Sequence, residues 1–141
     1  MNPVWKDSVE IGTSESGGTW SYSPLCKGIE SLNFASNEQA QQFFFLCGEG
    51  HATNEVTAIA PELRISGRRI AGDVAQDYIA DKQFALGDDR NSAIKITVEG
   101  KVITCACAVC DVVSFGGDST NVNAFSCTLK FNGKPTVTTA Q

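Results

Sequence analysis

The chain has 141 residues and a formal net charge of −5, with 42% hydrophobic and 19% charged residues. A chain of this length and composition forms one globular domain and is not a disordered segment. Its negative charge argues against a protein that grips nucleic-acid phosphates, and no apolar run approaches the ~20 residues of a membrane span. The first residues lack the basic region and apolar stretch of a secretory signal, so we expect a cytoplasmic product.

Residues 1–22 are predicted to form an extended N-terminal arm that packs poorly on an isolated subunit. Serine and glycine gather there, at Ser16, Gly17 and Gly18 among others, and such residues favour irregular chain ends. Trp5 and Trp20 lie on either side of this stretch. They either cover the edge of the core or dock onto a neighbouring molecule, because tryptophan is enriched at interface hot spots.

Strands are predicted over most of residues 25–70. Residues 39–47 end in three consecutive phenylalanines and a closing Gly48, and this aromatic enrichment favours a strand over a helix. A long loop follows near residues 48–55. Residues 56–70 indicate a strand region interrupted at Pro61.

One short α-helix is predicted over about residues 74–83. Asp73 has the residue type of an N-cap, and Gln76 stands three residues later, in the position of a capping box. Apolar side chains then recur at helical spacing, for example at Ala75 and Ile79. The helix should end before Gly87.

The C-terminal half has the pattern of β-strands. Ile94, Ile96 and Val98 alternate with polar residues, and Gly100 follows at a tight turn. Residues 102–113 are almost continuously apolar, as in a strand covered on both faces. Residues 125–131 alternate again, and residues 132–135 should end that strand. We therefore expect a β core over residues 23–135, a polar C-terminal tail over 136–141, and a mainly β fold: a sandwich or barrel of two packed sheets flanked by one short helix.

No constellation typical of an active site is present. His51 is the single histidine and stands in a glycine-rich loop without a partner motif. Cys105 and Cys107 would lie on one face of a strand and Cys110 on the other, so the three thiols do not converge on one metal ion. We expect buried, reduced thiols, no catalytic residues, no metal and no cofactor.

The excess negative charge lies in one segment. No Lys or Arg occurs between Lys27 and Arg64. Such a block is either solvated surface that keeps the protein soluble or an acidic face with a purpose. The segment holds five glutamates: Glu30, Glu38, Glu49, Glu55 and Glu62.

Five segments together resemble the tail tube (major tail) proteins of bacteriophages with long, non-contractile tails. They match that family in order and spacing from Trp20 nearly to the end of the chain. The segments are VTAIAPE (56–62) leading into SGRR (66–69), GDVAQDYI (72–79), ALGDDR (85–90), GGD (116–118) and FNGKP (131–135).

The resemblance implies one tail-tube domain over residues 1–141 that assembles into hexameric rings stacked as a hollow tube. Double-stranded DNA would pass through the lumen, and the partners would be further copies of the chain, a tape measure protein, and tail terminator and distal tail proteins. The subunit would be a non-enzymatic part of the virion tail, made in the host cytoplasm and not inserted in a membrane. The five glutamates are candidate lumen-facing acids, which would repel DNA. The candidate residues for self-assembly are Trp5, Trp20, Gly48, Gly50, His51 and Asn54.

Three alternatives stay open at this stage. A β-sandwich binding module for a receptor or carbohydrate would show clustered aromatics in its loops. The same fold also serves secretion-type tubes. An enzyme ranks last, because it would need a mechanism that uses no histidine and relies on paired carboxylates in a cleft.

Overall fold

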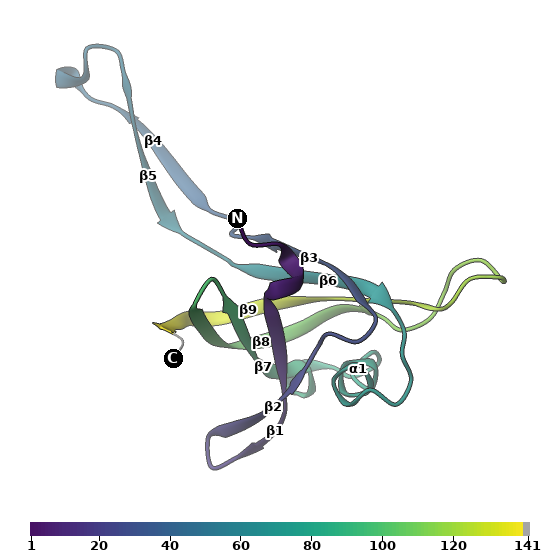
Figure 1. Ribbon diagram of the computed structural model, residues 1–141. Helices are drawn as coiled ribbons and strands as arrows, with labels where there is room; N and C mark the ends of the chain where they lie inside the picture. The colour runs from purple at the N-terminus through teal and green to yellow at the C-terminus, as the bar shows by residue number, and fades with distance from the viewer. Residues whose placement is uncertain (140–141) are drawn as a thin grey trace.

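The computed structural model describes residues 1–139, and its regular structure is almost entirely β (Figure 1). Seven strands form one sheet in the order β2-β1-β7-β8-β9-β6-β3, and β4 and β5 form a separate antiparallel pair. The strands are β1 Ser8–Ser16, β2 Thr19–Pro24, β3 Ile29–Ala35, β4 Gln39–Phe44, β5 Ala52–Ala58, β6 Glu62–Arg68, β7 Asn91–Val98, β8 Lys101–Val113 and β9 Ala124–Thr139. Helix α1 spans Val74–Ala80, and short 3-10 turns lie at Val4–Lys6, Leu46–Gly48 and Gly87–Arg90.

The large sheet bends so that its two halves face each other across one core, which makes a sandwich. Val9 and Ile11 of β1 belong to the same buried cluster as Leu63 and Ile65 of β6, although these strands lie far apart in the sheet order. Strands β2 and β3 remain as edges, so the sheet is not closed into a barrel. The mainly β sandwich with one short helix is confirmed.

Helix α1 is held against the sheet by the side chain of Gln76, which is fully buried. Its amide nitrogen donates to the carbonyl oxygens of Lys27 at 2.8 Å and Arg68 at 3.0 Å, and its amide oxygen accepts from the Ile70 N–H at 2.8 Å. Asp73 caps the helix by accepting from the Gln76 N–H at 3.2 Å, as predicted. The capping-box role predicted for the Gln76 side chain is wrong, because that side chain joins the helix to the ends of two strand regions.

The N-terminal segment differs from its prediction. Residues 1–22 do not form an extended arm, because β1 and β2 pair as a hairpin within the large sheet. Val9 and Ile11 pair with Ile96 and Ile94 of β7 and are buried. The segment does contain a short alternating pattern, Val9 and Ile11, among its serines and glycines, and packing against β7 makes it a strand.

Three further boundaries also differ. Helix α1 ends at Ala80, before the predicted limit at residue 83. Strand β9 does not stop at residues 132–135 but continues to Thr139, because an irregularity in its pairing with β8 accommodates Gly133 and Pro135. Residues 136–139 of the predicted tail are therefore strand, and residues 140–141 lie outside the described residues. Strand β8, predicted to be covered on both faces, has Ala106 exposed on its outer face.

The core contains three thiols that burial keeps protonated. Cys105, Cys107 and Cys127 are buried, and burial raises the pKa of Cys107 and of Cys127 to about 12. Cys26 and Cys47 are exposed, which departs from the expectation of buried thiols. No helix within residues 1–139 is long and apolar enough to cross a membrane.

Replacing the buried amide of Gln76 tests its structural role. Gln76→Leu keeps a similar volume but leaves two carbonyls and one N–H without their partner, so we expect the free energy of unfolding to fall by about 3 kcal/mol. Chemical denaturation of the monomer measures this change. Gln42→Leu, at an exposed glutamine of β4, is the matched control and should change stability by about 0.5 kcal/mol or less. Equal effects of the two substitutions would contradict the role given to Gln76.

Thiol labelling tests the placement of the cysteines. At pH 8 we expect a thiol reagent to modify Cys26 and Cys47 rapidly in the folded protein, since the thiolate is the reactive form and needs access. Cys107 and Cys127 should react only after unfolding, because their pKa of about 12 leaves almost no thiolate at that pH. Peptide mass spectrometry identifies the labelled residues, and rapid labelling of Cys107 or Cys127 in the native state would show that the core is arranged differently.

Candidate assembly surfaces

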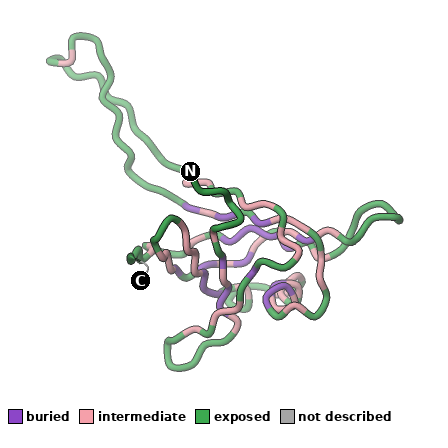
Figure 2. The backbone as a smooth tube through the Cα atoms, in the orientation of Figure 1, coloured by how far each residue is buried: buried purple, intermediate pink, exposed green. Residues whose placement is uncertain are grey.

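Strands β4 and β5 form a ribbon that projects from the body of the molecule, and we call residues 39–58 the arm (Figure 2). Every residue of the two strands is exposed, so the arm contributes nothing to the core. At its base, Ala60 donates its N–H to the Ser36 carbonyl at 2.9 Å and accepts from the Asn37 side chain at 3.1 Å. An isolated two-stranded hairpin is marginally stable in water. The arm therefore has the construction of an element that needs a second surface.

The far end of the arm is apolar. Phe43, Phe44, Phe45 and Leu46 are all exposed, and we call these four residues the arm tip. The rings of Phe43 and Phe45 stack with centroids 5.8 Å apart and an interplanar angle of 17°. The chain reverses just beyond them, through the 3-10 turn Leu46–Gly48 and the left-handed Glu49 with φ 52°. A group of large apolar side chains carried this far from a core is typical of a contact site.

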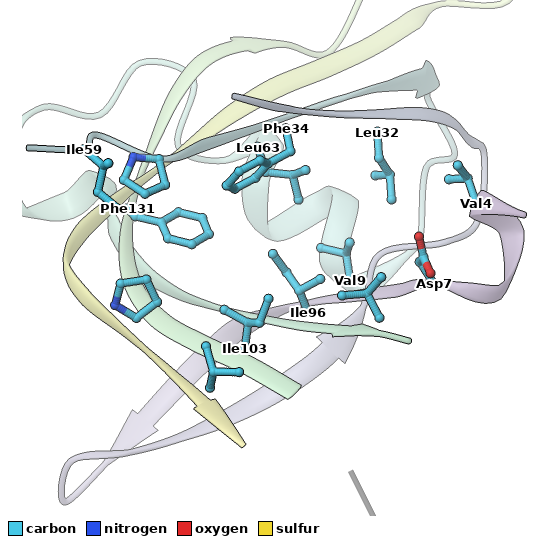
Figure 3. Close-up of a pocket in the computed structure, with 14 residues that line it drawn as sticks. Val4, Asp7, Val9, Leu32, Phe34, Ile59, Leu63, Ile96, Ile103 and Phe131 are labelled. Carbon is cyan, nitrogen blue, oxygen red and sulfur yellow. The ribbon is translucent and has the colours of Figure 1, made fainter. Parts of the chain in front are cut away.

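A second apolar surface lies at one end of the sandwich, where the core is open to solvent. Side chains of β1, β3, β6, β7, β8 and β9 point toward one another around a cavity of about 450 Å³, with the helix behind them (Figure 3). We call this cavity the mouth. Of the residues that line it, Asp7 is the one with a charge. The lining residues are Val4, Asp7, Val9, Leu32, Phe34, Ile59, Pro61, Leu63, Ile96, Val98, Ile103, Phe131, Pro135 and Val137.

The mouth is a continuation of the core, as the inward-facing rows of side chains show. On β9, Leu129 is fully buried, Phe131 is half-buried and Val137 is 57% exposed. On β7, Ile94 is fully buried while Ile96 and Val98 are half-buried. Helix α1 supplies Ala75 and Ile79 to the buried end, and nothing within residues 1–139 covers the other. The same strands are thus buried at the helix end and open to solvent at the mouth.

The structure separates the predicted assembly residues into groups. Gly48, Gly50, His51 and Asn54 lie together on the outer half of the arm. The loop predicted near residues 48–55 is shorter than expected, because strand β5 already begins at Ala52. The role of these four residues in assembly stays a prediction.

The two tryptophans occupy different parts of the molecule. Trp5 lies in the 3-10 turn Val4–Lys6, beside the mouth, and is exposed. Trp20 lies on β2 and is half-buried against Gly12, where an added Cβ would come within 2.6 Å of its ring. For Trp20, covering the edge of the sheet is therefore the role that the contacts favour, while Trp5 keeps an exposed ring.

The five glutamates are also divided. Glu38, Glu49 and Glu55 lie on or at the base of the arm and are exposed. Glu30 forms an ion pair of 3.4 Å with Arg68, and Glu62 lies opposite Lys130 on β9. The acid-only segment of the sequence is therefore mainly the arm, whereas the acids of the body share their surface with basic residues. None of these positions tests whether an acid faces a lumen.

Sequence reasoning missed the mouth and the arm tip. The signal for the tip was the phenylalanine triplet before Gly48, which was assigned to a strand without a partner. The signal for the mouth was the row of apolar residues along β9, from Leu129 through Phe131 to Val137. The prediction missed it because the strand was expected to end at residues 132–135. The described residues hold no group of three or more His, Cys, Asp or Glu side chains that could bind a metal ion.

Solved structures with a similar fold come from phage-like tails and from a tube-terminating cap. No protein-family model and no curated protein sequence matches the chain. A chain in the tail of an empty gene transfer agent particle with C6 symmetry superposes with a TM-score of 0.75 at 9% identity, covering 98% of this chain and 99% of that one. The corresponding match in the virion of a native gene transfer agent has a TM-score of 0.75 at 8% identity, with coverages of 98% and 99%. A chain in the tube-terminating cap of an anti-feeding prophage reaches 0.60 at 17% identity, with coverages of 98% and 91%.

These likenesses extend over nearly the whole chain at 8–17% sequence identity. The resemblance to tail tube proteins that the five sequence segments indicated is therefore confirmed at the level of structure. The chain has the fold of a tail tube protein.

Proposed function

We propose that this chain is a non-enzymatic structural subunit of a tail tube, and that it works in a virion tail by assembling with copies of itself. The proposal rests on one observation. A chain whose fold matches tail proteins over 98% of its length has both an exposed arm and a core that is open to solvent at one end. A monomer leaves both apolar surfaces in water. Assembly removes them from water, which is the main driving force of association.

Lateral contacts within a ring are proposed to use the two edges of the large sheet. Strands β2 and β3 lie at opposite ends of the sheet order, and each presents a row of backbone N–H and C=O groups. Contact between β2 of one copy and β3 of the next is head-to-tail, and head-to-tail contacts close into rings when the rotation is right. Six copies per ring is the number proposed, in line with the C6 symmetry of the gene transfer agent tail.

Passage of double-stranded DNA through the lumen is the proposed use of the tube, with tape measure, terminator and distal tail proteins as the other tail components. Acids on the inner wall would repel phosphates, so that DNA slides and does not adhere. Glu38, Glu49 and Glu55 of the arm are the candidates without a basic neighbour, whereas Glu30 on β3 and Glu62 on β6 share their surface with Arg68 and Lys130. A reconstruction of the assembled tube tests this, since a lumen wall without net negative charge would end the lumen proposal.

Electron microscopy of the purified protein tests the proposed function. We expect rings or filaments that appear as the concentration rises, alone or beside a tail-initiating partner. Replacing residues 39–58 by a two-residue Asn-Gly turn should leave the body folded, because the removed strands hold no buried residue, but should abolish long filaments.

A matched control changes the turn of another hairpin. Gly17→Asn alters the exposed β1–β2 turn at a position with φ 58°, which asparagine tolerates, and should leave filaments intact. A binding module would stay monomeric with or without its arm. If the full chain stays monomeric at every concentration and beside every tail-initiating partner, the proposed function is wrong.

A further inference from the structure

We propose that the arm tip of one copy enters the mouth of a second copy, so that four exposed apolar side chains complete its neighbour's unfinished core. This inference rests on the proposed function and deepens it, because it names the two surfaces that join. Both belong to the same chain, and they are chemically alike but differ in shape: one projects and the other is hollow.

The arm tip cannot fill the mouth of its own chain. The arm leaves the body between Ala35 and Ala60, and Phe34, Ile59 and Pro61 around this base already line the mouth. Five residue steps separate Gln39 from Phe44, which at ~3.4 Å per residue carries the tip roughly 17 Å away from the base. Figure 1 shows the arm directed outward from the body along this whole length. The occupant of the mouth must therefore come from another molecule.

The tip is arranged in advance for insertion. Phe43 and Phe45 are stacked on each other, and backbone hydrogen bonds from Gly48 N–H to the Phe45 carbonyl at 3.0 Å and from His51 N–H to the Gly48 carbonyl at 2.9 Å hold the turn behind them. A tip that is ordered before contact loses less conformational entropy on binding than a flexible loop. Aromatic anchors that fill an apolar pocket are the usual centre of a strong protein interface.

The mouth offers the complementary surface. Its volume of about 450 Å³ lies in the range of pockets that bury whole ligands, and its lining is apolar apart from Asp7. Tip and mouth are different patches, so the contact is not self-complementary. Each copy would present a tip to one neighbour and a mouth to another, and such a contact propagates from copy to copy.

The two lysines at the rim of the mouth support this pairing of surfaces by their charge, whereas Asp7 in the lining and Glu99 beside Val98 carry the same sign as the arm. The arm has no Lys or Arg, and it carries Glu49 at its outer end and Glu55 nearer its base, opposite Gln41. Exposed lysines stand at the margin of the mouth: Lys101 pairs in register with the mouth residue Val98, and Lys134 directly precedes the mouth residue Pro135. Neither lysine takes part in an ion pair within the described residues. Complementary charge at the rim of an apolar contact favours the correct partner and orientation.

A rival occupant is the N-terminal turn of another copy, because exposed Trp5 lies beside the mouth. The native thiol of Cys47, directly after the arm tip, separates the two possibilities by cross-linking. In a Cys26→Ser background, Val137→Cys places a thiol at the mouth. Val122→Cys places one outside the mouth lining, in the segment between β8 and β9 that projects from the other side of the body (Figure 1). Val122 is a matched control for Val137, since Val137 is 57% and Val122 is 61% exposed.

Oxidation under conditions where microscopy shows rings or filaments gives the readout. We expect Val137→Cys to form disulfide-linked dimers at least tenfold faster than Val122→Cys, and Cys47→Ser to abolish these dimers. Peptide mass spectrometry should find residue 137 joined to Cys47. Ile59→Cys is a second position at the mouth and should behave like Val137→Cys if the latter folds poorly.

The inference is overturned if assembled particles form but both valine positions cross-link equally, if neither mouth position cross-links, or if cross-linking persists after Cys47→Ser. Cross-linking of Trp5→Cys to Val137→Cys in the absence of Cys47 would assign the mouth to the N-terminal turn instead. A chain that forms no particles at all contradicts the proposed function itself, so the two failures are distinguishable.

Discussion

The structure depends on covering the apolar interior of one bent sheet. The inward-facing rows of β7, β8 and β9 run from one end of the sandwich to the other, but a helix covers one end alone. Gln76 fixes that helix by hydrogen bonds to three backbone groups, so the covered end is rigid and specific. The open end keeps apolar side chains in water, and this is unfavourable for a subunit on its own. Under the proposed function, a second copy covers this open end.

The arm follows from the same constraint. A ribbon in which every strand residue is exposed gains little stability from its own domain, and under the proposed function a second copy supplies the surface it lacks. Under the two proposals above, the sheet edges meet in one contact and the arm tip meets the mouth in another; both contacts are head-to-tail, which gives rings and stacks instead of closed dimers. The likeness to tail proteins at 8–17% identity concerns the fold as a whole.

Local patterns predicted much of the fold. The Asp73 cap, the alternation of Ile94, Ile96 and Val98, and the interruption at Pro61 are all decided within a few residues, so they can be derived from the sequence. The burial of Val9 and Ile11 and the continuation of β9 beyond Pro135 depend on partner strands distant in the chain. For the candidate site, the composition of residues 48–54 indicated an exposed segment, and their role in assembly stays a prediction. The mouth was missed because it exists only once six strands, β1, β3, β6, β7, β8 and β9, converge.

Hydrogen–deuterium exchange of the arm amides tests the central claim most directly. In the monomer, the amides of β4 and β5 should exchange rapidly, because their hydrogen bonds lie in an exposed ribbon with no core beneath it. In assembled particles the same amides, and those around Phe131 and Val137 at the mouth, should become protected together. Assembled particles in which the arm exchanges as fast as in the monomer would contradict the account.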